Sequence, residues 1–227
     1  MKIEVFTIAW NEEKTINQFI DWYSFADKIT IFDNHSTDQT RAIAKERGCD
    51  VFLYGPDQQD NRRMLEVKER CWRGCSADWV IVCDMDEFIY HPKLPVLLEK
   101  TTATVIECAG YVMVSEDELP RTELKMGARV KPDKSICFKP SKVKAMNWIH
   151  GCHLAYPEGE IKVMENTVKM LHYSLNGRAA TKERWREYKN RMSAWDIERG
   201  AGLHYTWGEE KIDLEFDTHL KNITKVW

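Results

Sequence analysis

Hydrophobic and polar residues alternate along the first hundred positions in a pattern that predicts strands and helices in turn. A helix is expected between the strands predicted at 3–9 and 28–32, because apolar side chains recur there at three- and four-residue spacing, as on one buried helix face. Further helices are expected at about 40–47 and 61–73. Short apolar runs rich in β-branched and aromatic residues are typical of buried strands, here at 3–9, 28–32, 50–54 and 79–83. Repeated strand–helix units favour a parallel sheet with helices on both faces.

The pattern is less regular in the second half. The polar segment 117–134, interrupted by two prolines and a glycine, is expected to be a loop that contacts substrate. A charged helix is expected at about 181–198. Short strands are expected near 104–108, 111–114, 136–138, 153–155 and 168–171. We expect one α/β domain over 1–227, with a regular front half at 1–100 and a mixed back half at 101–227.

Composition narrows the functional classes. The net charge of −3 shows no basic excess, so a nucleic-acid partner is not expected. No run approaches the roughly 20 apolar residues of a transmembrane helix, and the charged start does not resemble a signal peptide. The seven cysteines are an odd number, which favours a reducing compartment. We therefore expect a cytoplasmic protein.

Three carboxylates follow the fourth predicted strand directly. Asp84, Asp86 and Glu87 come at the end of the apolar run 79–83. Ligands of open α/β sheets bind beyond the carboxyl ends of the strands, where these acids are expected. Crowded carboxylates repel one another unless a cation or protons neutralise them. A hard divalent ion, Mg²⁺ or Mn²⁺, is the natural partner of such oxygen ligands.

Polar clusters also follow the other predicted strands, at 11–13, 33–38 and 60–63. In a doubly wound sheet these loops share one edge and line one crevice with the acidic segment. A structural interpretation is also open, because Asn11 and Asp38 are typical helix-capping residues.

These clusters carry a resemblance to a known family. Asn11-Glu12-Glu13, then Asp33-Asn34-His35-Ser36-Thr37-Asp38, then Asp84-Met85-Asp86-Glu87-Phe88 resemble the successive motifs of family 2-like glycosyltransferases of the GT-A fold. The last motif is similar to that of a bacterial subgroup with Asp-x-Asp-Glu-Phe. The resemblance covers about residues 1–90. It implies a GT-A, Rossmann-like, mostly parallel sheet flanked by helices, with a smaller mixed or antiparallel C-terminal part.

The resemblance also implies an activity. It implies metal-dependent transfer of a sugar from a nucleotide-diphosphate sugar, most simply a UDP-sugar, to an unknown acceptor such as a glycan or a lipid-linked sugar. The cofactor would be Mn²⁺ or Mg²⁺. The first hundred residues would bind the nucleotide, and the remainder would complete the metal site and bind the acceptor.

Individual residues receive roles from the same resemblance. Asp84 and Asp86 would hold the metal, with Asp86 the direct ligand, and Asp33 and Asn34 would lie by the nucleobase. The rest of the donor site would comprise Ala9, Asn11, Glu12, Arg62, Arg63 and Met85. Further candidates to pair with phosphate are Lys68, Lys139, Lys142, Lys144 and Arg178.

A third metal ligand and an acceptor-activating base are expected after the acidic motif. His172 is the first choice for the ligand, followed by His153 and His150, although single histidines are commonly structural. Glu116 and Asp117 are the candidate bases of an inverting enzyme, although this segment is more typical of a solvated acidic loop. A retaining enzyme would need no such base.

Two rival functions stay open. A metal-dependent nucleotidyltransferase would be expected to carry a glycine-rich phosphate loop after the first strand, and residues 9–12 contain no glycine. A non-catalytic nucleotide-sugar-binding or regulatory protein could keep the donor site and lack acceptor chemistry.

Overall fold

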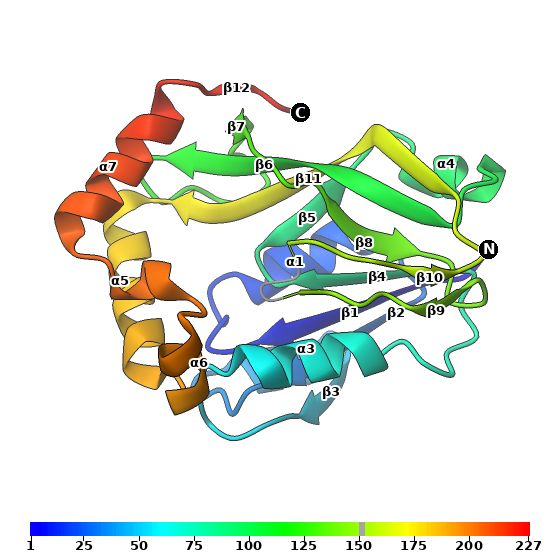
Figure 1. Ribbon diagram of the computed structural model, residues 1–227, viewed down its shortest axis with the longest axis horizontal. Coiled ribbons are helices and arrows are strands. Elements are labelled where there is room, and N and C mark those ends of the chain that lie inside the picture. The colour runs from blue at the N-terminus through cyan, green and yellow to red at the C-terminus, as the bar shows by residue number, and fades with distance from the viewer. Residues whose placement is uncertain (150–152) are drawn as a thin grey trace.

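The computed structural model describes residues 1–149 and 153–227 and contains one large mixed sheet (Figure 1). Its front half is the parallel unit expected from the sequence. The strands β1, β2, β3 and β4 span Ile3–Ala9, Lys28–Asp33, Asp50–Leu53 and Trp79–Asp84. They pair in the order β4-β1-β2-β3, and each of these pairs is parallel. Their carboxyl ends therefore share one edge.

Helices cover both faces of this unit. One face packs against α1 (Ile16–Trp22), α2 (Thr40–Glu46) and α4 (Leu94–Lys100), with Phe19 and Trp79 among the buried side chains. The other face packs against α3 (Asn61–Arg70). Because β1 and β4 are buried on both faces, they are almost continuously apolar, as expected for parallel strands.

The second half adds antiparallel strands. β8 (Lys134–Phe138) pairs antiparallel with β4 and with β6 (Val105–Ser115). β11 (Val163–Asn176) runs parallel to β6 and antiparallel to β5 (Glu87–Tyr90). The remaining strands are β7 (Met126–Arg129), β9 (Val143–Ala145), β10 (Glu158–Gly159) and β12 (Thr224–Lys225).

Helices of the C-terminal segment stand at the edge toward which β1 points (Figure 1). They are α5 (Arg178–Arg191), α6 (Ala194–Arg199), the 3-10 helix η2 (Leu203–Thr206) and α7 (Glu209–Leu220). Gly177 makes the turn from β11 into α5 at φ 88°, where a Cβ atom would stand 2.8 Å from the Glu118 nitrogen. None of the helices in the described ranges combines the length and the apolar character needed to cross a lipid bilayer.

The structure corrects several sequence-based expectations in the back half. The helix expected at 181–198 is two helices, because the chain becomes extended at Met192 and Ser193, and the Ser193 hydroxyl caps α6. The strands expected at 104–108 and 111–114 are one strand, β6, and β7 lies within the expected loop 117–134. Residues 153–155 form no strand.

One expected helix cap is also wrong. Asn11 does not cap α1, whose N-cap position is Thr15. Asn11 instead adopts a left-handed conformation at φ 51°. Its main chain and side chain are therefore used to build the loop after β1.

Candidate functional site

The acidic segment lies where β4 ends, and its three carboxylates have different partners. Asp84 ends β4, and its Oδ1 is 2.6 Å from Nζ of the buried Lys68 on α3. Glu87 begins β5, pairs with the buried Lys134 on β8 and accepts a 3.0 Å hydrogen bond from the Asp84 amide. Asp86, in the turn between the two strands, faces His172. Asp84 and Glu87 are therefore paired with lysines, whereas Asp86 is paired with His172.

Asp86 and His172 form a pair set by backbone register. β11 runs antiparallel to β5 with His172 opposite Glu87, and the Tyr173 amide donates a 2.9 Å hydrogen bond to the Asp86 carbonyl. His172 Nε2 consequently lies 3.3 Å from Asp86 Oδ2. Burial would raise the pKa of Asp86, but the charge and hydrogen bond of His172, together with the charges of Arg121 and Lys134, hold that pKa below its usual range. Conversely, Asp86 outweighs the effect of burial and raises the pKa of His172.

The pair suits two adjacent positions of a divalent ion. A carboxylate oxygen and an imidazole nitrogen about 3 Å apart match neighbouring ligands of an octahedral ion with bonds of about 2.1 Å. Within residues 1–149 and 153–227, no cluster of three or more His, Cys, Asp and Glu side chains is arranged to hold a metal. Asp86 and His172 are therefore two groups that could contribute to a coordination sphere, and ions that also bind substrate phosphates commonly take only one or two side chains from the protein.

The loops after β1 and β2 hold each other in place. The Asn11 amide donates to Ser36 Oγ at 2.9 Å, and Asn11 Oδ1 accepts from the Thr37 amide at 2.8 Å. Asp33, which is fully buried, accepts from the Ser36 amide at 2.9 Å and from the Ser36 hydroxyl at 2.5 Å. The structure thus uses Asn11 and Asp33 to shape the loops beside the crevice.

Helix α5 carries the largest set of contacts that sequence reasoning missed. Arg184 donates to the carbonyls of Trp10 and Asn11, each at 2.8 Å, and also pairs with the Glu12 carboxylate. Arg191, two turns later, stacks 3.8 Å above the Trp10 ring. The spacing of these residues was a usable signal, since both arginines fall on one helix face.

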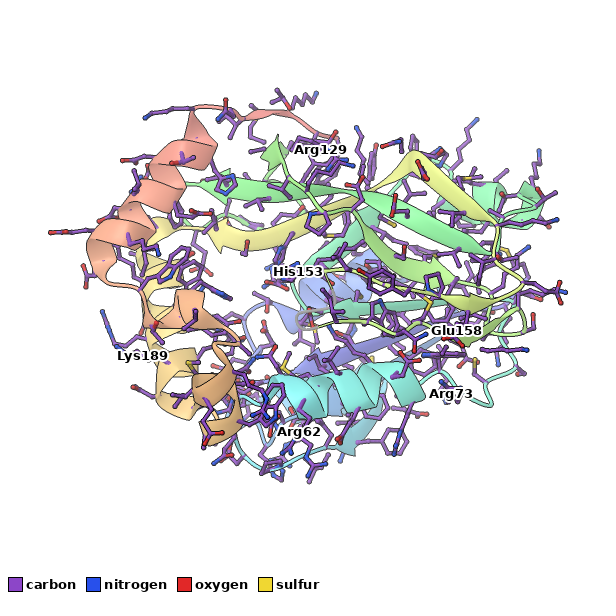
Figure 2. All side chains as sticks on the ribbon, viewed as in Figure 1. Arg62, Arg73, Arg129, His153, Glu158 and Lys189 are labelled. Carbon is purple, nitrogen blue, oxygen red and sulfur yellow. The ribbon has the colours of Figure 1, made fainter. Side chains whose placement is uncertain are left out.

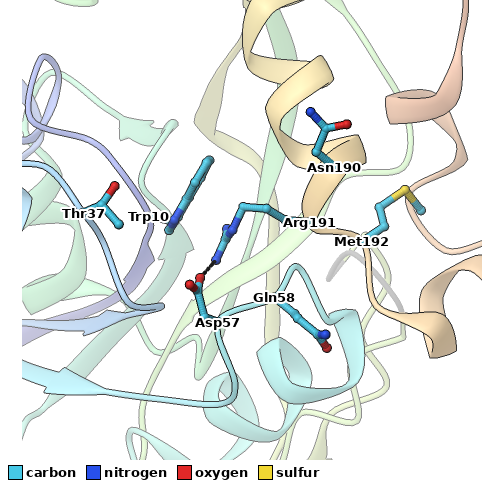
Figure 3. A pocket seen from close by; sticks show the side chains of 7 residues that line it. All are labelled: Trp10, Thr37, Asp57, Gln58, Asn190, Arg191 and Met192. Carbon is cyan, nitrogen blue, oxygen red and sulfur yellow. Dashed lines mark hydrogen bonds and ion pairs between the residues drawn. The ribbon is translucent and has the colours of Figure 1, made fainter.

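A pocket of about 330 Å³ lies between the end of α5 and the loops after β1, β2 and β3 (Figure 3). Arg191 Nη2 donates to Asp57 Oδ1 at 2.8 Å and to Asn34 Oδ1 at 2.7 Å. Arg191 Nη1 is buried and has no hydrogen-bond partner within the described residues. The lining residues are Trp10, Thr37, Asp57, Gln58, Asn190, Arg191 and Met192.

Asn34, expected beside the nucleobase, has a fully engaged side chain. Its Nδ2 donates to the carbonyls of Tyr54 at 3.2 Å and Pro56 at 2.8 Å, and its Oδ1 is bound by Arg191. Asn34 therefore joins the loop after β2 to the loop after β3 and to α5. Its predicted contact with the base stays a prediction, and this geometry favours an indirect role.

Aromatic residues of η2 form another wall that the sequence left unassigned. The Tyr205 ring packs 4.9 Å from Tyr188 on α5 and 4.0 Å from His204. Burial, followed by nearby Tyr188, Asp86 and Asp84, raises the pKa of Tyr205 well above its usual value. The Tyr205 hydroxyl therefore keeps its proton in the neutral range and is available as a hydrogen-bond donor near the acidic segment.

The remaining predicted residues lie in varied surroundings. Ala9 and Met85 are buried at the ends of β1 and β4, and the Met85 carbonyl accepts a 2.8 Å hydrogen bond from Arg121. Arg62 and Arg63 are exposed on α3, and Arg62 is labelled in Figure 2. Arg62 lies 3.4 Å from Asp60, and Arg63 lies 2.7 Å from Glu66. Shielding by neighbouring atoms, followed by the charge of Lys134, lowers the pKa of His153 to about 4. His150 lies outside the described residues.

The candidate bases are on the solvent side of the C-terminal helices. Glu116 forms a two-point ion pair with Arg178 on α5, at 2.8 and 2.6 Å. Asp117 is exposed. Of the cations predicted to reach phosphate, Arg178 is held by three acids, Lys142 pairs with Glu160, and Lys139 stands over the Trp79 ring; Lys144 is exposed. The phosphate and base roles of these residues stay predictions.

Comparisons with known proteins agree with the resemblance found in the motifs. The glucosyl-3-phosphoglycerate synthase of Petrotoga mobilis is 32% identical over 105 residues, which cover 41% of this chain and 32% of that protein. The chain thus matches about a third of the length of this curated relative. A family model described as "Glycosyl transferase family 2" matches residues 4–154.

Solved structures are similar at lower identity. Glucosyl-3-phosphoglycerate synthase from Mycobacterium tuberculosis, in complex with Mn²⁺, UDP-glucose and phosphoglyceric acid, is 23% identical with a TM-score of 0.35, covering 49% of this chain and 43% of that one. Staphylococcus aureus TarS, residues 1–349, is 12% identical with a TM-score of 0.49, covering 84% and 65%.

The topology described above, a parallel sheet flanked by helices and extended by antiparallel strands, is the arrangement expected for the GT-A fold, and that expectation is confirmed. The family model covers more than half of the chain and includes all three motifs that carry the resemblance. The chain belongs to glycosyl transferase family 2.

Proposed function

We propose that this protein transfers a sugar from a nucleotide-diphosphate sugar, with UDP as the nucleotide, and that it requires Mn²⁺ or Mg²⁺. The observation that carries the proposal is the Asp86–His172 pair, 3.3 Å apart at the edge where β1, β2 and β4 end. Family membership supports the sugar-transfer class.

The donor would lie across the strand ends. Asp86 and His172 would hold the divalent ion, and the donor's diphosphate would fill positions that the protein leaves open. The pocket beside Trp10, Asp57 and Arg191 has a size and position that suit the nucleobase. A flat base can stack on the Trp10–Arg191 pair, and the buried Arg191 Nη1 is a donor that still needs an acceptor.

The chemistry would depend on charge and on exclusion of water. The bound ion supplies positive charge to the diphosphate as it leaves the sugar. Asp86 and His172 fix where that charge stands, and the Tyr205 hydroxyl can donate a hydrogen bond on the same side. The wall formed by α5 and η2 would limit the access of water, which favours transfer to an acceptor over hydrolysis.

The acceptor is proposed only as a class. The name of the Petrotoga relative makes phosphoglycerate, a small anionic hydroxy acid, the first acceptor to test. Glycans and lipid-linked sugars are the next candidates. Because Glu116 is bound by Arg178, it must leave that pair before it can act as a base.

Calorimetric titration with UDP tests the donor site directly. We expect micromolar binding that needs Mn²⁺, and much weaker binding of GDP and ADP. UDP binding that is equal with and without Mn²⁺ would contradict the metal-dependent site.

Asp86→Asn is the sharpest single change. It keeps the size of the side chain and removes the charge that pairs with His172, so Mn²⁺-dependent affinity for UDP should fall on the order of 100-fold. The matched control is Glu99→Gln, the same change on the exposed surface of α4, which should leave affinity unchanged. Equal affinities of wild type and Asp86→Asn would remove Asp86 from the site.

A non-catalytic binding protein is the rival that shares this site. Incubation with UDP-glucose, Mn²⁺ and a panel of acceptors that includes phosphoglycerate distinguishes the two, because the proposal requires release of UDP. Tight donor binding with neither transfer nor hydrolysis would favour the rival.

A further inference from the structure

Two buried lysines lie beneath the acidic segment, and no sequence pattern explains why they are there. Lys68 on α3 and Lys134 on β8 each have side chains only 4% exposed. Lys68 Nζ is 2.6 Å from Asp84 Oδ1, and Lys134 pairs with Glu87. Burying an ammonium group costs free energy unless the group is paired, so each lysine is held in place by the acid with which it pairs.

The lysines change the charge that a metal ion meets. Asp84, Asp86 and Glu87 together would present three negative charges, and the two ammonium groups leave one. Asp84 and Asp86 lie close enough for their charges to interact, so an ion held by Asp86 and His172 would also lie near the Lys68 ammonium that pairs with Asp84. Positive charges a few ångströms apart repel strongly in partly buried surroundings.

We propose that Lys68 is a positioning residue that keeps Asp84 away from the metal and weakens the binding of a free divalent ion, so that the ion binds tightly only together with the diphosphate of the donor. This inference rests on the proposed function. The diphosphate brings its own negative charge, which offsets the repulsion from Lys68. Without the diphosphate, the ion has the Asp86–His172 pair and little net attraction.

The arrangement has a functional consequence. If metal and nucleotide bind as one unit, they also leave as one unit, and a site with the ion alone is scarcely populated. The two affinities must then be coupled by the same factor in both directions. A purely structural role for Lys68 would not couple the affinity for the metal to the affinity for the nucleotide.

The test is a titration of Mn²⁺ alone, followed by the electron paramagnetic resonance of the free ion, with and without saturating UDP. In Lys68→Met the repulsion is lost and Asp84 is released, so Mn²⁺ alone should bind on the order of tenfold tighter or more than to wild type. The gain in Mn²⁺ affinity on adding UDP should shrink correspondingly. Damage to the site would instead weaken Mn²⁺ binding.

Two controls match the change. Lys45→Met removes the same charge from the exposed surface of α2 and should leave Mn²⁺ affinity unchanged. Lys68→Arg keeps the charge and should keep the weak binding of Mn²⁺ alone. Circular dichroism melts check that each variant is folded.

A second pair of variants covers the case in which Lys68→Met fails to fold because Asp84 loses its partner. Asp84→Asn should weaken Mn²⁺ binding, since it removes the carboxylate charge that pairs with Lys68. The double variant K68M/D84N has the wild-type charge balance and no unpaired buried charge, so it should bind Mn²⁺ more tightly than D84N does.

The outcomes separate the two proposals. Wild type that binds Mn²⁺ tightly with UDP, together with Lys68→Met that binds Mn²⁺ alone no more tightly than wild type, would overturn the inference and leave the proposed function standing. Wild type that does not bind Mn²⁺ even with UDP would overturn both.

Discussion

Glu87 shows how one side chain can serve the site without facing it. Its carboxylate bridges the Lys134 ammonium and the Asp84 amide, and its carbonyl accepts a 2.9 Å hydrogen bond from the Tyr23 hydroxyl. Burial would raise the pKa of Glu87, but the charges of Lys134, Lys68 and His172 together lower it to about 2. The ionised Glu87 carboxylate therefore holds in place the turn that carries Asp86.

This anchor predicts a pH dependence of stability. The folded pKa of Glu87 is below its unfolded value, so its contribution is complete above the unfolded value of about 4.5 and is lost as pH falls toward about 2. Urea unfolding of wild type and Glu87→Gln should differ most at pH 6–7, and the difference should shrink progressively below about pH 4.5. A difference that is constant from pH 7 to pH 3 would show that Glu87 is not ionised in the folded protein.

At the same scale, the sequence predicted that the acidic segment follows a strand, and the structure has it there, but the lysines that pair with Asp84 and Glu87 were not predicted. Asp86 and His172 each end an apolar run, which is a local signal. The engagement of Asn34 by Arg191 joins residues 157 positions apart, and no local pattern encodes such a contact. The residue types at the strand ends could be predicted from the sequence. Which of these side chains are bound to one another in the folded protein could not.

Helix α5 links the C-terminal segment to the loops of the front half. Arg184 is the main contact, since it binds two carbonyls and the Glu12 carboxylate, while Arg121 stands 3.7 Å from the other oxygen of Glu12. Periodicity predicted a helix here but placed its end beyond Met192, because a charged helix gives no apolar signal of where it stops. The cap at Ser193 marked the boundary.

Removing Arg184 should destabilise the protein and loosen α5. Arg184→Met removes the nearer of the two arginines that pair with Glu12 and leaves two carbonyls without their donor, so the free energy of unfolding should fall by about 2–3 kcal/mol. Hydrogen exchange in α5 should become faster. Arg186→Met is the control on the same helix, because its 3.5 Å contact with Glu209 is exposed and should matter by less than about 0.5 kcal/mol. Equal stability of the two variants would show that the Arg184 contacts are not needed.

On the scale of the whole molecule, the two halves were unequally predictable. The front half repeats strand and helix with period-specific patterns, and its parallel order follows from connection rules. The back half depends on pairings such as β8 with β4 and β11 with β5, which cross long stretches of chain and include short strands. Its helix α7, which covers the ends of β6 and β11, was not predicted from the sequence.

Arg178 connects three parts of the back half and predicts a salt effect. It pairs with Glu116 after β6 and with Asp213 and Asp217 on α7, at 2.6, 3.2 and 2.7 Å. Arg178→Met should lower the melting temperature by a few degrees in dilute buffer. Because the acids are partly exposed, the difference from wild type should shrink in 1 M NaCl, where charges are screened within about 3 Å. A difference unaffected by salt would mean that stacking of the Arg178 guanidinium on the Phe216 ring dominates.

The contacts of α5 with the loops after β1, β2 and β3 also limit which segments of this protein can be exchanged for those of a relative. Arg184 and Arg191 donate hydrogen bonds to main-chain carbonyls and a few side chains of those loops. A C-terminal segment taken from a relative would therefore pack against loops with which its contacts do not fit. Chimaeras that exchange residues 178–227 alone should therefore lose function more often than those that exchange the loops at 10–12, 34 and 57 with them. Natural relatives should show the same pairing, with the two segments changing together over evolutionary time.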